Sequence, residues 1–337
     1  MNKIKMILMM AVIVLNSFLF AACSNECNCG NECKCNMILT GSKDGYDFVI
    51  DGYKNGYCIE KYDGKETEIV VPSEFNGLPV VIIGEGAFGY NSKIKSITLP
   101  DSINEIGDYA FSDCRNLESI DFGNGVWSIG RYAFARCIDL KEIIFPEGLS
   151  NLGDGVFSYC GKLSKVVIPN TLRALPPLAF SNCGSLTDIV VNDTLESIGA
   201  NAFKDCVGLK EVTIPATVTV LEGSTFLYCD NIEKITVLSV TNIPRGEFSS
   251  LPALTEVVFG SGVKTIGRDA LFNCPNLTTI SLSAEVTKIG DGAFFQCQSL
   301  EKILFEGSAT EWFAIEKGEL AFPSSNYDLI FNATLPQ

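Results

Sequence analysis

G-D-Y-A-F-S-D-C-R-N-L-E-S-I-D-F, at Gly107–Phe122, is one of a series of similar motifs that recur along this chain of 337 residues. Close copies are Gly130–Phe145, G-R-Y-A-F-A-R-C-I-D-L-K-E-I-I-F, and Gly199–Ile214, G-A-N-A-F-K-D-C-V-G-L-K-E-V-T-I. Successive copies are 23 residues apart, except for one step of 22 between Phe226 and Phe248. The central residues of the ten copies are Phe88, Phe111, Phe134, Phe157, Phe180, Phe203, Phe226, Phe248, Leu271 and Phe294. A period of this size predicts a stack of repeats instead of a globular core.

Each repeat carries apolar residues at eight positions, which we number from the central aromatic residue: −1, 0, +3, +6, +9, +11, +15 and +18. The spacing 0, +3, +6 predicts a short helical turn, for which Asp108 and Asp291 are candidate caps. The alternation at +9 and +11, as in Ile120-Asp121-Phe122, predicts a strand. One repeat buries too little apolar surface to be stable alone, so the repeats must stack on one another. The expected fold is an α/β solenoid of parallel strands joined by short helical turns.

The segment Leu117–Phe122, with its L-x-x-I-x-F pattern, resembles the core of leucine-rich repeats. The full unit A-F-x-x-C-x-x-L-x-x-I-x-L/F-P, with its 23-residue step, is similar to the BspA-like subfamily of bacterial surface proteins. The resemblance covers about Ile69–Phe305. It implies a curved leucine-rich-repeat solenoid with a parallel sheet on its concave face. It also implies a cell-surface or secreted protein, and some members of the family are adhesins for host matrix proteins.

The pattern predicts five parts of the chain. Residues 1–22 are a signal peptide, 23–36 a Cys-rich tether, 37–75 an N-terminal β-hairpin cap, 76–305 the solenoid and 306–337 a C-terminal cap. Turn pairs such as Asp44-Gly45 and Asn55-Gly56 favour the hairpins. In the last part, Thr310–Lys317 favours a short amphipathic helix and Tyr327–Phe331 a final strand.

The N-terminus has the features of an export signal. Lys3 and Lys5 precede an apolar run that ends in small residues directly before Cys23. The sequence Leu19–Cys23 resembles the bacterial lipobox, which implies lipidation of Cys23 and display at the cell envelope or cell surface. Ordinary cleavage, with Cys23 an unmodified thiol, is the alternative.

Two groups of cysteines suggest further chemistry. Four of them follow the signal, and their C-x-C spacing differs from the C-x2-C of zinc sites, so a flexible, partly oxidised tether is the preferred interpretation over a metal site. These are Cys27, Cys29, Cys33 and Cys35. A second group occupies position +3 of the repeats, where a disulfide or metal ladder is conceivable. Because Leu251 takes that position in one copy, buried reduced thiols explain the pattern better.

Composition limits the function. The chain has 25 Lys and Arg against 40 Asp and Glu, a net charge of −15, which disfavours binding to nucleic acid. It has no histidine, which removes the usual general base and most zinc sites. We therefore expect no catalytic residues, no metal site and no cofactor. An enzyme that uses carboxylates is the weaker alternative.

A ligand surface is expected where strand side chains point away from the core, at positions +8 and +10. There the apolar residues Ile144, Val167 and Val190 form a stripe beside a row of mixed charge, Glu142, Lys165 and Asp188. Such a stripe can mark a partner site, although β-branched residues are also simply good strand formers. Non-catalytic binding of an extracellular protein, such as a host matrix protein, is the first hypothesis. A carbohydrate-binding or cell-envelope scaffold module is the second, and Trp127 alone does not decide between them.

Overall fold

The computed structural model describes residues 40–51, 54–323 and 327–335. These belong to one compact unit that begins at Thr40. The predicted signal peptide, Cys23 and the Cys-rich tether lie outside the described residues.

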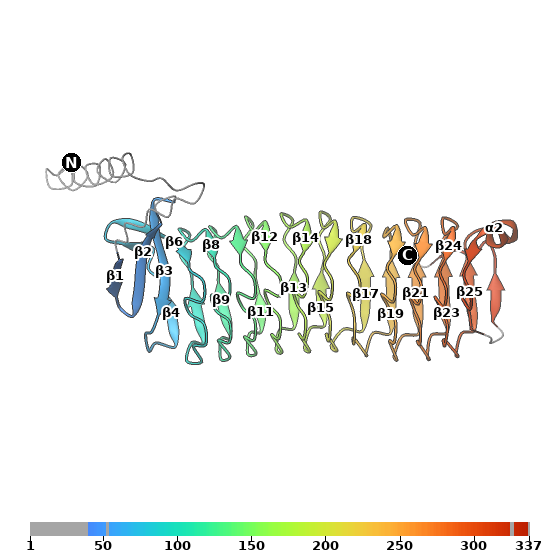
Figure 1. Ribbon diagram of the computed structural model, residues 1–337, viewed down its shortest axis with the longest axis horizontal. Helices are drawn as coiled ribbons and strands as arrows, with labels where there is room; N and C mark the ends of the chain where they lie inside the picture. The colour runs from blue at the N-terminus through green and yellow to red at the C-terminus, as the bar shows by residue number, and fades with distance from the viewer. Residues whose placement is uncertain (1–39, 52–53, 324–326, 336–337) are drawn as a thin grey trace, which may run out of the picture. The chain divides into compact units, whose positions relative to one another are not determined.

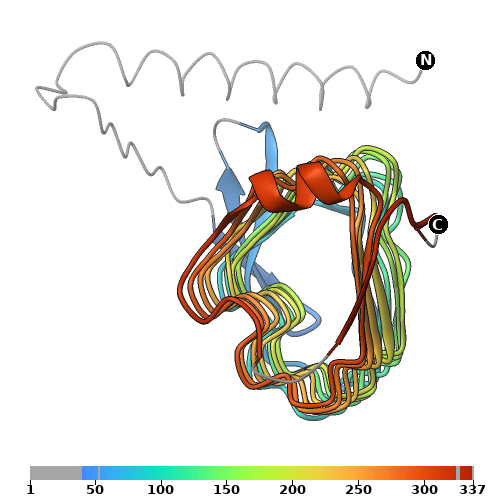
Figure 2. The same cartoon turned by 90° about the vertical axis from the view of Figure 1, so that its right-hand side faces the viewer.

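The described chain coils into a solenoid of stacked turns, as the repeat predicts (Figure 1). Each turn has three sides: one strand in a first sheet, one strand in a second sheet, and a side made of tight turns. We call the outer surfaces of the two sheets face I and face II. Seen from its end, each coil lies over the next with a small offset, and curvature along the stack is slight (Figures 1 and 2).

Face I begins at the strand after the N-terminal cap. Its strands are β4 (Glu68–Val70), β7 (Ser96–Thr98), β9 (Ser119–Asp121), β11 (Glu142–Ile143), β13 (Lys165–Val167), β15 (Asp188–Val190), β17 (Glu211–Ile214), β19 (Lys234–Val237), β21 (Glu256–Phe259), β23 (Thr279–Leu282), β25 (Lys302–Phe305) and β27 (Asp328–Ile330). Neighbouring strands pair in parallel with a register of one repeat, as in β13 and β15, and this pairing is interrupted between β9 and β11 and between β15 and β17. These strands contain the predicted +8 to +10 residues.

Face II is formed by the second apolar stretch of each repeat. Its strands are β6 (Leu78–Ile83), β8 (Glu105–Ile106), β10 (Ser128–Ile129), β12 (Asn151–Leu152), β14 (Ala174–Leu175), β16 (Ser197–Ile198), β18 (Val220–Leu221), β20 (Asn242–Ile243), β22 (Thr265–Ile266), β24 (Lys288–Ile289) and β26 (Glu316–Lys317). At its start, β3 (Gly56–Tyr62) pairs with β6, and the antiparallel strands β2 (Tyr46–Asp51) and β1 (Thr40–Lys43) extend the sheet. A short strand, β5 (Glu74–Phe75), pairs with β6 as well.

The third side corrects one expectation. The predicted helical turns are consecutive tight turns, with bonds three residues apart such as Cys114 N to Phe111 O, 3.2 Å. The cause is a positive φ at positions −2 and +2 of the repeats, 56° at Tyr109 and 58° at Asp113, which a continuous helix does not allow. Asp108 is consequently not a helix cap, because its carboxylate accepts from the Arg131 amide of the next turn, 2.7 Å. Asp291 likewise accepts from the Glu319 amide, 2.9 Å.

The core is a set of ladders along the solenoid axis. Phe111, Phe134 and Phe157 are fully buried and stack with ring centroids 5.0 and 5.3 Å apart. Backbone bonds follow the same axis, since the amide of each central residue except Phe226 donates to the next turn, as Phe111 N does to Ala133 O, 2.7 Å. Each repeat is therefore held mainly by its neighbours, as expected of a solenoid.

The cysteines at position +3 are free and buried. Each thiol donates to a carbonyl one turn back, as Cys137 Sγ does to Phe111 O, 3.2 Å. Burial raises the pKa of the Cys114 thiol to about 12, so this thiol stays protonated and unreactive. The ladder is a packing device in which a small thiol also satisfies a buried carbonyl.

The C-terminal end continues the coil with an insertion. The helix α2 (Ala309–Ala314) begins at a capping box in which Ser308 and Glu311 bond reciprocally. Its Trp312 is buried and packs on Phe305 and Phe322, with centroids 5.4 and 5.7 Å away. Phe322 stacks on Phe294 at 5.2 Å, so it takes the place of the central aromatic in a last turn.

The 22-residue step disturbs the ladders. Phe226 and Phe248 are 6.3 Å apart, and the Phe226 amide lacks the bond to the next turn that the other central amides make among the described residues. Glu247 stands where most repeats have alanine and is 2% exposed. Its carboxylate accepts from the Thr225 amide, 3.1 Å, and burial raises its pKa to about 7.

Candidate binding surface

The six residues predicted for ligand binding lie together on face I. Strand pairing places Lys165 between Glu142 and Asp188, and it places Val167 opposite Val190. Ile144 directly follows β11 and continues the same column as Val167. The residues therefore form two short parallel rows over three neighbouring strands, β11, β13 and β15.

The apolar row is open to solvent. Ile144 is 76% exposed, Val167 46% and Val190 43%. At these positions the side chain points away from the core, which Ile143 and Val166 fill from the opposite side of their strands. Exposed apolar patches of this kind can mark interaction sites.

The charged row is only partly self-neutralised. Lys165 Nζ lies 3.3 Å from Asp188 Oδ2, and both side chains are more than half exposed. An ion pair this exposed contributes little to stability, about 0–1 kcal/mol. Glu142 is exposed and makes no ion pair within the described part of the chain. The row therefore offers both signs of charge to a partner.

Three successive positions of the same column are buried in the C-terminal half of face I. Thr236, Val258 and Ser281 also point away from the core, yet they are 8%, 1% and 0% exposed. A side chain on the outer surface of a sheet is buried only when something lies over it. The sequence pattern did not indicate this difference.

The segment after β27 turns back toward the strands of face I. The chain reverses at Asn332, which has a φ of 52°, and the Ala333 amide then donates to the Phe305 carbonyl at the end of β25, 3.1 Å. Ala333 and Leu335 are half-buried while Thr334 between them is exposed. In the end-on view, the chain after β27 lies outside the coil (Figure 2). The open part of the column is therefore the part nearer the N-terminus.

The side of the coil made of tight turns carries tyrosines that the sequence pattern of the strands did not predict. Tyr109 and Tyr132 occupy position −2 of successive turns and stack at 5.5 Å with their planes 12° apart. Tyr109 is 45% exposed, and Tyr90 on the preceding turn is 81% exposed. The recurrence of Tyr at −2 in adjacent repeats is the signal that could have found them.

Trp127 is 44% exposed on the edge of face II. Lys54 Nζ lies 5.7 Å from the centroid of its ring, and Lys54 also forms an ion pair with Glu105. The ring thus already has a cation partner within the chain. This makes Trp127 a weaker candidate platform than the stacked tyrosines.

Neither metal-binding nor membrane-spanning groups are found in the described residues. Within 40–51, 54–323 and 327–335, no three His, Cys, Asp or Glu side chains gather in a way that could hold a metal ion. Of the helices in these ranges, none has the length and apolar character needed to cross a bilayer.

Several solved structures with similar folds are of bacterial proteins. A leucine-rich cell surface protein from Faecalibacterium prausnitzii is 24% identical, covers 82% of this chain and 97% of its own, and has a TM-score of 0.57. The pneumococcal vaccine antigen PcpA is 17% identical, with 88% of each chain covered and a TM-score of 0.54. These likenesses confirm the predicted leucine-rich-repeat solenoid. A comparison with curated proteins found no match.

The repeats themselves match a family model. The model of the BspA type leucine rich repeat region matches residues 63–187 and 174–301, in six copies. The two ranges together span most of the solenoid, including the strands that carry the open stripe. The chain belongs to the BspA-type leucine-rich-repeat family.

Proposed function

We propose that this protein is displayed on the bacterial cell surface and binds an extracellular protein without catalysing a reaction. The binding site is the open stripe of face I, formed by Ile144, Val167 and Val190 with the charged row beside it. The observation that carries the proposal is the solvent exposure of this stripe in a column that is buried elsewhere.

The stripe has the composition of a small interface. Its apolar row would be removed from water on binding, which supplies affinity. Glu142, Lys165 and Asp188 would pair with charges on the partner and favour one orientation over others. A host matrix protein, large and polar with exposed apolar segments, is a partner of the appropriate kind.

Two observations support surface display: the signal pattern in the sequence and the description of a structural relative. The signal pattern before Cys23 supports export followed by lipid anchoring at that residue. A structural relative is described as a leucine-rich cell surface protein. Replacing Cys23 with alanine should release the protein into the medium and abolish incorporation of a labelled fatty acid.

Binding can be tested with the purified protein on arrays of matrix proteins and glycans. The double substitution Ile144→Lys/Val167→Lys should abolish saturable binding to a protein partner. Val220→Lys is the matched control, because Val220 is also a half-exposed strand valine, 49%, but lies on face II. If both variants bind as the unchanged protein does, the stripe is not the site.

A carbohydrate-binding module is the second candidate. The exposed Tyr109, which stacks on the half-buried Tyr132, favours it, because a sugar ring can pack on the free face of an aromatic ring. Binding to glycans alone, lost in Tyr109→Ala and retained in Ile144→Lys/Val167→Lys, would establish this function. Binding to neither class would leave an envelope scaffold as the best account.

A further inference from the structure

The two sheets end differently at the N-terminal end of the solenoid. Face II continues beyond its first solenoid strand, since β6 pairs with β3 and the sheet extends through β2 to β1. Face I stops at β4, which pairs with β7 on one side and with no described strand on the other. The strands β1 to β3 therefore cover the end of face II and leave the outer edge of β4 in face I without a paired strand among the described residues.

The backbone groups on that edge can be identified from the register. The Thr67 carbonyl accepts from the Ser96 amide, 3.2 Å, and the Val71 amide donates to the Thr98 carbonyl, 2.9 Å. In a parallel pair, alternate residues of a strand bond to the same neighbour. Ile69 accordingly faces β7, and the N–H and C=O groups of Glu68 and Val70 point outward from the sheet.

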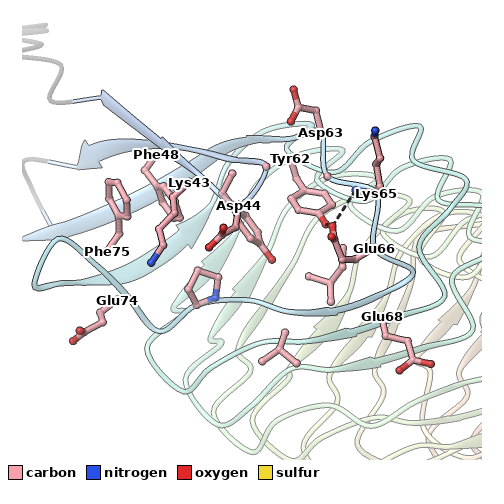
Figure 3. A pocket seen from close by; sticks show the side chains of 16 residues that line it. Lys43, Asp44, Phe48, Tyr62, Asp63, Lys65, Glu66, Glu68, Glu74 and Phe75 are labelled. Atoms are coloured by element: carbon pink, nitrogen blue, oxygen red, sulfur yellow. Dashed lines mark hydrogen bonds between the residues drawn. The ribbon is translucent and has the colours of Figure 1, made fainter.

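A pocket of about 620 Å³ lies beside this edge (Figure 3). Glu68, Ile69 and Val70 line one side of it, and the β1–β2 turn and β2 line the other. Phe75 is half-buried in the lining and stacks on the buried Phe48 at 4.2 Å, so the ring of Phe75 gives the pocket an apolar part. Its volume is within the range of about 300–1,000 Å³ that is common for ligand sites.

The rim of the pocket is acidic. The lining contains two lysines, Lys43 and Lys65, against five carboxylates, which are Asp44, Asp63, Glu66, Glu68 and Glu74. The Tyr62 hydroxyl donates a hydrogen bond to the Glu66 carboxylate, 2.7 Å away, and this bond lowers the pKa of the Glu66 carboxyl. Glu68 and Glu74 are exposed and make no ion pair within the described residues. An acidic edge also disfavours pairing with the same edge of a second copy.

We propose that the outer edge of β4 is a binding site for an extended cationic peptide segment that adds to face I as a further strand. Its backbone bonds to Glu68 and Val70, as in other cases of strand addition. Apolar side chains on one side of the peptide pack toward Phe48 and Phe75, and lysines or arginines on the other side lie beside Glu68 and Glu74. This site is separate from the stripe and does not depend on the function proposed for it.

The test uses the full-length protein and a fluorescent six-residue peptide that alternates lysine and valine. Binding should be saturable, and the same peptide with glutamate in place of lysine should bind at least about tenfold more weakly. Val70→Pro removes the outward N–H without breaking the pair with β7, and it should weaken binding by about tenfold or more. Val70→Ala is its matched control, because it keeps the N–H, and it should bind nearly as the unchanged protein does.

The charge reversal Glu68→Lys/Glu74→Lys gives an independent arm, since both side chains are exposed and the variant should fold. It should abolish binding of the lysine–valine peptide. Equal affinity for the two peptides, or equal affinity of Val70→Pro and Val70→Ala, would overturn the proposal. So would dimerisation of the protein without peptide that Val70→Pro prevents, because the occupant would then be a second copy.

Discussion

Val167 and Val258 occupy the same position of two repeats, yet one is 46% exposed and the other 1%. Both side chains point outward from face I, and both strands pair in parallel with their neighbours. The repeats do not explain the difference, and the segment after β27, which turns back and bonds to the end of β25, is the part of the chain outside the repeats on this side. In a solenoid, the repeat thus determines which side chains form the core, but not which outward positions are available to a partner.

The boundary between the two halves lies near the 22-residue step. The open stripe ends at Val190, and the covered part of the column begins at Thr236, between Phe226 and Phe248. Glu247 is buried at this step. The rings of Phe226 and Phe248 are also the most widely separated neighbours in the aromatic ladder from Phe88 to Phe248. We expect the two halves to differ in their outer surface while sharing one core.

The largest effect should come from removing an aromatic of the shared core. Phe157 lies beneath the open half and stacks on both sides, at 5.3 and 5.7 Å. Phe157→Ala should reduce the free energy of unfolding by about 3–5 kcal/mol, measured by urea unfolding. Leu271→Ala, the same position beneath the covered half, should cost about 2–5 kcal/mol. A loss below about 1 kcal/mol in either half would mean that the halves do not share this core.

The boundary should be sensitive to pH because of Glu247. Burial raises the pKa of its carboxyl from 4.5 to about 7 in the folded protein. Between these pH values the folded state therefore binds more protons than the unfolded state. The contribution of Glu247 to stability is greatest below pH 4.5 and is lost as the pH rises through about 7. The loss should approach about 3 kcal/mol.

Glu247→Gln keeps the shape of the side chain without its charge and serves as the control. The free energy of unfolding of this variant should lose that part of the pH dependence. At pH 8 the variant should be more stable than the unchanged protein. If the two proteins show the same slope between pH 5 and 8, Glu247 is not the titrating group.

A lysine substitution in each half compares the outer surfaces directly. Val258→Lys should destabilise the protein by about 2 kcal/mol, because it removes a buried valine and places a charge at a buried position. Val167→Lys should change stability by no more than about 0.5 kcal/mol, since its site is open. Thermal unfolding of the pair measures both values. Equal losses would show that the two halves are equally covered.

The smallest effect is expected for the ion pair in the open half. Lys165→Met removes the partner of Asp188 and should alter the free energy of unfolding by less than about 0.5 kcal/mol, because both groups are exposed. Its effect on partner binding should be larger than its effect on stability. The opposite ranking, found by comparing urea unfolding with binding, would assign Lys165 a structural role.

The sequence was sufficient to predict the core but not its surroundings. The 23-residue period and the apolar positions predicted the solenoid, its parallel strands and the burial of Phe111 and Cys114, since each depends on local spacing. The helical turns were wrong because non-glycine residues such as Tyr109 adopt positive φ, which no residue-type pattern announces. Val167 and Val258 are outward valines at the same repeat position, so no repeat-based argument could predict that only Val258 is buried.

The central claim is that the open stripe, and not the rest of face I, contacts the partner. Hydroxyl-radical footprinting of the protein, free and bound to a partner identified on the arrays, tests this directly. We expect Ile144, Val167 and Val190 to be oxidised in the free protein and protected in the complex, and Val258 to be protected in both. Protection at Tyr109 and Tyr132 with no change at the stripe would contradict the account.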